Sequence, residues 1–201
     1  MYYYSIKRIL DILGAFLGIT FLLPLLPFIA IAIKLDSDGP VLIKLKRVSS
    51  GKIIQAYKFR TMKKNTHQMK YNELANLNER RDGPFFKIKN DPRLTRIGKI
   101  LRKIRLDEFP QLINVLNGGL ALVGPRPHEP EEVIHYPDKY RDLILAKAGV
   151  TGLSQVNGAS SLPFLKELEL DDYYIKNQSL WLDFKILIKT LAILFTDPTG
   201  V

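Results

Sequence analysis

The chain contains a long apolar stretch near its start, and no other feature of the sequence limits its fold as strongly. From Ile9 to Leu35, ILDILGAFLGITFLLPLLPFIAIAIKL, only Asp11 and Lys34 are charged. A helix of this length would be about 40 Å long, which is enough to cross a bilayer. A cleavable signal peptide has a shorter apolar region followed by small residues, so we reject that interpretation. A buried core helix is the less favoured alternative, because a small domain has little room to surround a segment that is apolar on all sides.

Two details favour a bent membrane helix over a straight one. Pro24 and Pro27 each remove a backbone donor from the stretch, which favours a kink. Cations also flank the stretch on both sides, at Lys7, Arg8, Lys34, Lys44, Lys46 and Arg47. A spanning helix usually has its positive bias on one side only. We therefore expect residues 1–35 to enter one leaflet and return as a re-entrant helix-break-helix, with a tilted single span as the alternative.

The composition indicates an anionic partner. The chain has 201 residues, which suits one domain or a domain with an appendage, and its formal net charge is +10. Such a charge favours nucleic acid, a lipid surface or phosphate-bearing small molecules, and composition does not choose among them. The chain has no cysteine, which excludes disulfides, cysteine nucleophiles and cysteine-ligated zinc. The GxSxG, Walker A, GxGxxG and HExxH motifs are also absent from the sequence.

The remainder, 36–201, is expected to form a mostly helical α/β catalytic region with a small β-hairpin. Residues 41–62, VLIKLKRVSSGKIIQAYKFRTM, combine β-branched residues with a Ser-Ser-Gly turn, which predicts the hairpin. The polar segment that follows predicts a helix near 66–80 and then a loop. Thr95 is a suitable N-cap for a further helix over 96–105.

Two amphipathic stretches are candidates for helices that lie in the membrane interface. The first, 96–105, has cations around one apolar stripe formed by Ile97, Ile100, Leu101 and Ile104. The second, 179–195, contains Trp181 and Phe184, which suit the headgroup region. Beside a membrane segment both helices could rest on anionic lipid. The alternatives are a solvated charged face for the first helix and ordinary core packing for the second.

Asp107 and Glu108 interrupt the most cationic part of the chain. They follow RIGKILRKIR and precede Phe109, Pro110 and an apolar run. A new helix is expected to begin at one of the two acids, because proline is tolerated in a first helical turn. In one interpretation Asp107 is only an N-cap, and Glu108 a first-turn residue favoured by the helix dipole. In the other, an ionised aspartate attacks phosphorus to form an acyl phosphate, while a divalent metal and cations hold the phosphates.

A series of motifs in this order resembles the small monotopic bacterial phosphoglycosyl transferases, the sugar transferases that begin lipid-linked glycan assembly. The resemblance covers nearly the whole chain and is most specific over 90–127. Its segments are YSIKRILDILGA, GPVLIKLKRVSSG, KFRTM, NDPRLTRIGKILRKIRLDEFPQLINVLNGGLALVGPRP, GVTGLSQVNG and LELDDYY.

The resemblance implies transfer of a sugar phosphate from a UDP-sugar to polyprenyl (undecaprenyl) phosphate, with release of UMP and a covalent phosphosugar intermediate. It implies Mg²⁺ as cofactor and the cytoplasmic face of the bacterial inner membrane as location. The expected partners are the UDP-sugar, the polyprenyl phosphate and membrane phospholipid, with downstream glycosyltransferases as candidates and no nucleic acid.

The resemblance also implies roles for individual residues. Asp107 is implied as the nucleophile and a metal contact, and Glu108 as its partner, which would manage the proton of the acceptor phosphate. Substrate-binding positions are implied at Lys58, Arg60, Arg102, Pro125, Arg126, Pro127 and Asp171.

The chain departs from the family pattern at a few positions. A family Gln is Leu45, a turn Gly is Ser49, the Arg that follows QVNG is Ala159, and the usual Ser-Pro break is Leu23-Pro24. These differences leave the identity of the sugar open. Two hypotheses from other classes also stand. A membrane-anchored nucleic-acid-binding protein would use the basic helix but gives the two acids no role. A non-catalytic paralogue that scaffolds glycan assembly would explain Ala159 but not an intact acidic pair.

Overall fold

The computed structural model describes residues 2–196 and is a mostly helical α/β fold, which confirms the predicted fold class. The α-helices are α1 (Tyr2–Leu22), α2 (Leu26–Asp36), α3 (Arg96–Lys103), α4 (Gln111–Leu116), α5 (Pro130–Val133), α6 (Leu153–Val156), α7 (Phe164–Lys176) and α8 (Leu180–Thr196). The strands are β1 (Leu42–Ser49), β2 (Lys52–Phe59), β3 (Ala121–Val123) and β4 (Gly149–Thr151). The 3₁₀ turns are η1 (Leu23–Leu25), η2 (His67–Lys70), η3 (Ala75–Leu77), η4 (Leu106–Glu108), η5 (Asp138–Ile144) and η6 (Ala159–Ser161).

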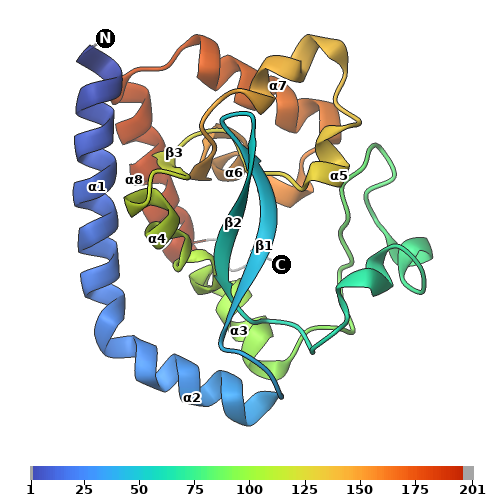
Figure 1. Ribbon diagram of the computed structural model, residues 1–201. Coiled ribbons are helices and arrows are strands. Elements are labelled where there is room, and N and C mark those ends of the chain that lie inside the picture. The colour runs from blue at the N-terminus through green and yellow to red at the C-terminus, as the bar shows by residue number, and fades with distance from the viewer. Residues whose placement is uncertain (1, 197–201) are drawn as a thin grey trace.

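Helices α1 and α2 form one apolar arm that bends where the prolines lie. Pro24 is in η1, and Pro27 lies in the first turn of α2, where its missing N–H costs no hydrogen bond within that helix. Figure 1 shows α1 along one side of the molecule and α2 turned across one end. The arm, Tyr2–Asp36, is long and apolar enough to cross a membrane, and 11% of its most apolar part is buried. The alternative of a buried core helix is therefore wrong, because the protein covers too little of the arm.

The charged residues of α1 contact the rest of the protein. Lys7 Nζ donates to Asp183 Oδ2 on α8 (2.8 Å), and the Arg8 guanidinium donates to the last two carbonyls of α4 (2.6 and 2.9 Å). Asp11 Oδ1 accepts from the Leu122 N–H on β3 (2.9 Å). Because each charge has a partner in a different element, these contacts fix α1 against the rest of the fold.

The predicted β-hairpin is confirmed. β1 and β2 pair antiparallel from Leu42–Phe59 to Ser49–Lys52. Ser50 and Gly51 both have positive φ angles, +52° and +69°, as the turn of a two-residue hairpin requires. Alternation along β2 turns Phe59 into an apolar cluster with α2 and α3 and leaves Lys58 on the other face.

The predicted helix near 66–80 is wrong, and the segment forms only the 3₁₀ turns η2 and η3. Asn78 shows one reason. Its side chain exchanges hydrogen bonds with the backbone of Arg80, Phe85 and Lys87, at 2.9 to 3.1 Å. Asparagine favours such local turns over a continuous helix because its amide competes with the backbone ladder.

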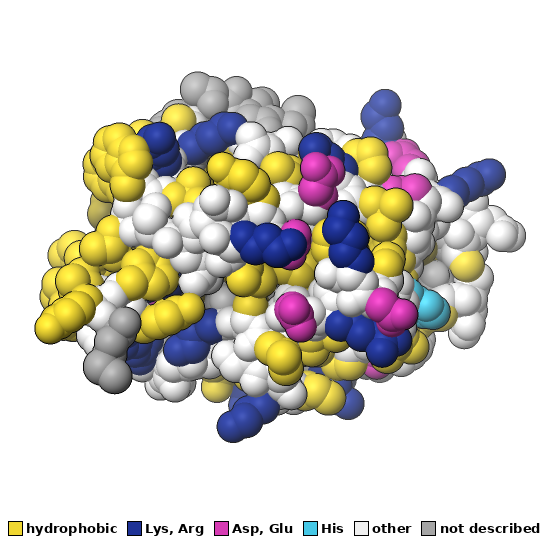
Figure 2. Space-filling view, turned by 90° about the horizontal axis from the view of Figure 1, so that it is seen from above, with side chains coloured by type: hydrophobic (Ala, Val, Ile, Leu, Met, Phe, Trp, Pro, Cys, Tyr) yellow, Lys and Arg dark blue, Asp and Glu magenta, His cyan; other side chains and the backbone are white. Residues whose placement is uncertain are grey.

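The two amphipathic helices form as predicted. Thr95 Oγ1 caps α3 by accepting from the Gly98 N–H (2.9 Å), and α3 leaves Ile100 exposed. Trp181 and Phe184 of α8 are also exposed. Figure 2 shows hydrophobic side chains gathered on the side where Figure 1 places α1 and α8. Contact of these faces with lipid remains a prediction, and this apolar surface is what such contact needs.

Gly98 sets how closely α3 approaches the end of the hairpin. A Cβ on this residue would lie 2.0 Å from the carbonyl oxygen of Thr61, so backbone would have to move. We expect Gly98→Ala to lower the free energy of unfolding by about 1–3 kcal/mol, measured by denaturant unfolding in detergent. Gly119→Ala is the control, since its Cβ would meet nothing closer than 3.6 Å. Equal losses in the two variants would contradict this close packing.

Candidate active site

A cavity of about 810 Å³ lies where the end of β2 and the residues that follow it meet η4 and η6. Its wall is rich in cations, with Lys58, Arg93, Arg102 and Arg126 among the lining residues. Asp107 and Glu108 are also part of this wall. A cavity of this size suits a nucleotide-sized ligand, and its cations suit one that carries phosphate.

Neither acid caps a helix. Asp107 and Glu108 lie in η4, which no side chain caps, and the N-cap of α4 is Pro110. The N-cap interpretation of Asp107 is therefore wrong. η4 follows Arg105, whose left-handed backbone (φ +55°) ends α3 and turns the chain toward the cavity. Asp107 is buried there, and Lys58 Nζ makes an ion pair with Glu108 Oε1.

The two acids have opposite electrostatic environments. Burial by itself would raise the pKa of Glu108, but the Lys58 ammonium and the Arg126 guanidinium outweigh it and hold this pKa at about 2. For Asp107, burial outweighs the attraction of Lys58, and the charge of Glu108 adds to it, so the pKa is raised. A further positive charge near Asp107, from a metal or a bound ligand, would therefore favour its ionised form.

Other elements fix Arg102 and Arg126 in the cavity wall. Arg102 Nε donates to Thr61 Oγ1 at 3.1 Å. The main-chain N–H of Arg126 donates to Asp171 Oδ2 (2.9 Å), and Arg126 Nε lies 3.6 Å from Glu167 Oε1. Asp171 thus supports the cavity from behind, through the backbone of Arg126, and is not among its lining residues.

The other predicted substrate contacts are Arg60, Pro125 and Pro127. Arg60 borders the cavity, but its buried guanidinium donates to the carbonyls of Pro40 (2.6 Å), Ile33 (3.2 Å) and Ser37. These groups belong to the end of α2 and the turn after it, so Arg60 holds the membrane arm. Pro125 and Pro127 flank Arg126 without lining the cavity, and the Pro125 carbonyl accepts from Gly149 N–H. The structure therefore brings together Asp107, Glu108, Lys58, Arg102 and Arg126.

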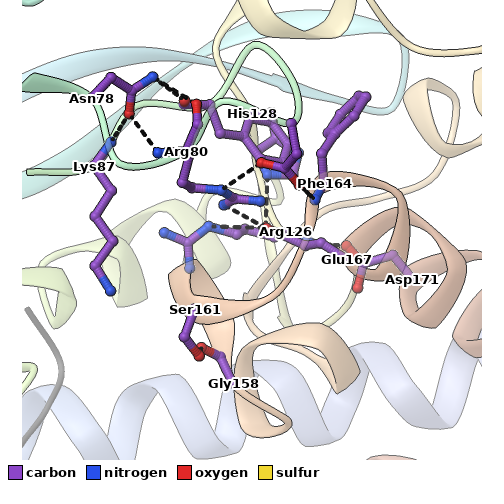
Figure 3. Close-up of polar contacts among 12 residues, drawn as sticks. Asn78, Arg80, Lys87, Arg126, His128, Gly158, Ser161, Phe164, Glu167 and Asp171 are labelled. Carbon is purple, nitrogen blue, oxygen red and sulfur yellow. Dashed lines mark hydrogen bonds and ion pairs between the residues drawn. The ribbon is translucent and has the colours of Figure 1, made fainter. Parts of the chain in front are cut away.

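Sequence reasoning missed a buried acid behind Arg126. Glu167 accepts from Arg80 Nη1 (3.0 Å) through Oε2, and Oε1 lies 3.1 Å from His128 Nε2. Figure 3 shows these side chains and Arg126 converging on Glu167. The available signal was its position four residues before Asp171, which places both acids on one face of α7.

The departures from the family pattern separate into two groups. Leu45 and Ala159 line the cavity, and Ala159 has a left-handed backbone (φ +46°). Ser49 is structural: its hydroxyl donates to the Gly119 carbonyl (2.8 Å) and accepts from the Ala148 N–H (3.1 Å). Two of the differences are thus placed where a ligand would meet them.

Asp107 and Glu108 are suitable ligands for the Mg²⁺ that the sequence resemblance implies. The described residues contain no cluster of three or more histidine, cysteine or acidic side chains that would hold a metal by themselves. Mg²⁺ commonly takes one or two carboxylates and completes its shell with substrate phosphates and water. Asp107, beside Glu108 in a cavity suited to phosphate, supplies such an incomplete donor set.

The fold places a cavity with a cation-rich wall and two adjacent acids beside an apolar helical arm. A family model described as bacterial sugar transferase matches residues 2–197. The chain belongs to this family, which confirms the resemblance seen in the sequence.

Curated relatives are similar over almost the whole chain. An undecaprenyl-phosphate galactose phosphotransferase of Salmonella typhimurium is 38% identical over 94% of this chain and 40% of its own length. An N-acetylgalactosaminephosphotransferase of Aeromonas hydrophila, named for UDP-N-acetylgalactosamine and undecaprenyl phosphate, is 38% identical over 96% and 44%. A UDP-glucose:undecaprenyl-phosphate glucose-1-phosphate transferase of Escherichia coli is 37% identical over 92% and 39%. The chain thus spans about two fifths of the length of these relatives.

Asp171 gives a testable pH dependence. Burial raises its pKa from 3.8 to about 6, so between these pH values the folded protein keeps a proton that the unfolded chain releases. Stability from this group therefore falls as pH rises through the window, by about 3 kcal/mol at about 1.4 kcal/mol per pKa unit. We expect Asp171→Asn, which can still accept from Arg126, to remove this fall in the free energy of unfolding measured from pH 4 to 6.

The neighbouring Asp172→Asn is the control for Asp171, since Asp172 pairs with Lys176 at the surface of the same helix. This control should keep the wild-type pH profile. If Asp171→Asn kept that profile as well, the raised pKa of Asp171 would be refuted.

Proposed function

We propose that this chain is a phosphoglycosyl transferase that moves a sugar-1-phosphate from a UDP-sugar to undecaprenyl phosphate. The observation that carries the proposal is the pair of buried Asp107 and half-buried Glu108 against Lys58 in a cation-walled cavity, in a fold with an apolar arm. The names of the relatives support this reaction class. They print galactose, N-acetylgalactosamine and glucose as different sugars, so the proposal names no particular sugar.

Two displacements at one phosphorus would account for the reaction. In the first, a carboxylate oxygen of Asp107 bonds to the phosphorus that bears the sugar, and the bond from that phosphorus to UMP breaks with its electron pair leaving on UMP. In the second, an oxygen of undecaprenyl phosphate bonds to the same phosphorus, and the bond to Asp107 breaks, which restores the carboxylate. Lys58, Arg102 and Arg126 line the cavity and would offset the phosphate charge.

We propose an electrostatic role for Glu108. A carboxylate with a pKa of about 2 is a weak base for the proton of an acceptor phosphate. Its ion pair instead holds the Lys58 ammonium beside Asp107. Asp107, with Glu108 beside it, would hold Mg²⁺, and the bound ion would supply charge neutralisation at the phosphates.

We further propose that the arm is re-entrant, with both of its ends at the cytoplasmic face of the bacterial inner membrane. The bend at Pro24 and the protein contacts of Lys7, Arg8 and Asp11 support this topology, because those charges reach the same domain that follows α2.

The topology can be tested with tags at residue 1 and at the C-terminus in intact cells. We expect neither tag to be reached from outside, and both to become accessible when the inner membrane is opened. A tag at residue 1 that is labelled from outside, with the C-terminal tag protected, would show a single span instead.

The activity test is UMP release by the purified protein in nanodiscs with Mg²⁺, undecaprenyl phosphate and a panel of UDP-sugars. We expect release with at least one donor. Asp107→Asn should lower the rate at least about a thousandfold, since it removes the nucleophile. EDTA should abolish release, and added Mg²⁺ should restore it.

Mass spectrometry of the protein with donor but without acceptor provides the second readout. A phosphosugar adduct on Asp107, absent from Asp107→Asn, is the expected result. No UMP with any donor and no adduct would overturn the proposal and favour a non-catalytic scaffold. Wild-type turnover in Asp107→Asn would refute the role of this residue alone.

A further inference from the structure

Arg126 lies between two acids that belong to different parts of the molecule. On the cavity side is Glu108, whose pKa the Arg126 charge helps to lower. On the other side Glu167 Oε1 lies 3.6 Å from Arg126 Nε. The backbone of Arg126 is held as well, by Asp171 one turn further along α7. Two acids of α7 therefore hold Arg126, Asp171 through its main chain and Glu167 through its side chain.

Glu167 is itself held rigidly. It is 0% exposed, and Arg80 Nη1 (3.0 Å) and His128 Nε2 (3.1 Å) bind its two oxygens. His128 Nδ1 is in turn hydrogen-bonded to the Tyr136 hydroxyl. A buried carboxylate with this many partners has little freedom to move, so it provides a fixed point for the Arg126 guanidinium.

Glu167 also stabilises a second part of the cavity wall, through Arg80. The Arg80 guanidinium lies over the Phe85 ring (4.5 Å), and that ring stacks on His128 (4.3 Å). The three residues after Phe85, at positions 86–88, line the cavity. Figure 3 shows the Arg80 and Arg126 side chains both directed toward Glu167. Glu167 therefore joins the segment around Arg80 to the segment that carries Arg126.

We propose that Glu167 is a positioning residue for Arg126, which it holds in the cavity wall so that the guanidinium can bind the phosphates of the donor. The proposal rests on the proposed function, since the donor is the UDP-sugar. After Glu167, the acid whose charge acts most strongly on Arg126 is Glu108, and Lys58 already pairs with Glu108. Glu167 keeps the Arg126 guanidinium apart from the Lys58–Glu108 pair and available to the ligand.

The kinetic test is a double-mutant cycle with Glu167→Gln and Arg126→Ala, measured as kcat/KM for the UDP-sugar. We expect each single variant to lower kcat/KM about 10- to 100-fold, since loss of positioning is costly. In the Arg126→Ala background, Glu167→Gln should have a clearly smaller effect, because the residue that it positions is gone and only its contact with Arg80 is left to lose. Glu167→Asp, which keeps the charge, should recover part of the activity. Glu169→Gln is the matched control, because Glu169 lies on the same helix and pairs with Lys166 at the surface.

A readout without turnover keeps the test independent of the proposed function. In ¹⁵N spectra the Arg126 Nε–H signal, assigned by its loss in Arg126→Lys, should shift and exchange faster with water in Glu167→Gln but not in Glu169→Gln. Thermal unfolding of each variant establishes that it is folded, and Glu167→Asp replaces Glu167→Gln if the latter is not.

The outcomes separate the positioning role of Glu167 from the proposed transferase function. An unchanged Arg126 signal in the Glu167 variant, or losses in kcat/KM that multiply fully in the double variant, would overturn the positioning role. A shifted Arg126 signal in a protein that releases no UMP from any donor would leave the contact established. It would refute the transferase function and, with it, the role of Arg126 toward a donor.

Discussion

The charge balance between Lys58 and the acidic pair is the constraint on which the rest of the site depends. Two adjacent carboxylates cannot both be withdrawn from water without cations close by. Lys58 reaches Glu108 from β2, whereas the acids lie in η4 after α3, so the hairpin and the helical segment must meet at this point. The close approach of α3 to Thr61 at Gly98 brings them together. The cavity exists because these two elements join at their ends.

The apolar arm belongs to the same arrangement. Its polar residues are placed so that the first half of α1 can lie against the domain, and its prolines turn α2 away. The exposed apolar surface of the arm and the cation-walled cavity are thus parts of one structure. The lipid phosphate acceptor and the nucleotide-sugar donor that we propose would come from different places, and this arrangement would offer each of them an approach.

Local features were the most predictable from the sequence. The hairpin followed from its turn residues, α3 from Thr95 and its apolar stripe, and the bend of the arm from its prolines. Glu167 was not predictable, because its ion pair with Arg80 joins residues 87 positions apart and only the tertiary fold brings them together. The helix expected near 66–80 failed because side-chain hydrogen bonds of Asn78 replace the helical ladder, a choice that composition does not reveal.

The three residues at the end of β2 and just after it have a consequence for protein engineering. Lys58 reaches the acidic pair, Phe59 packs against α2, and Arg60 binds the carbonyls at the end of α2. The apolar arm and the candidate active site therefore share one short piece of chain and are not separable modules. A chimera that exchanges the N-terminal helices between relatives has to transplant the end of this strand with them, since a mismatched joint would displace the Lys58 ammonium.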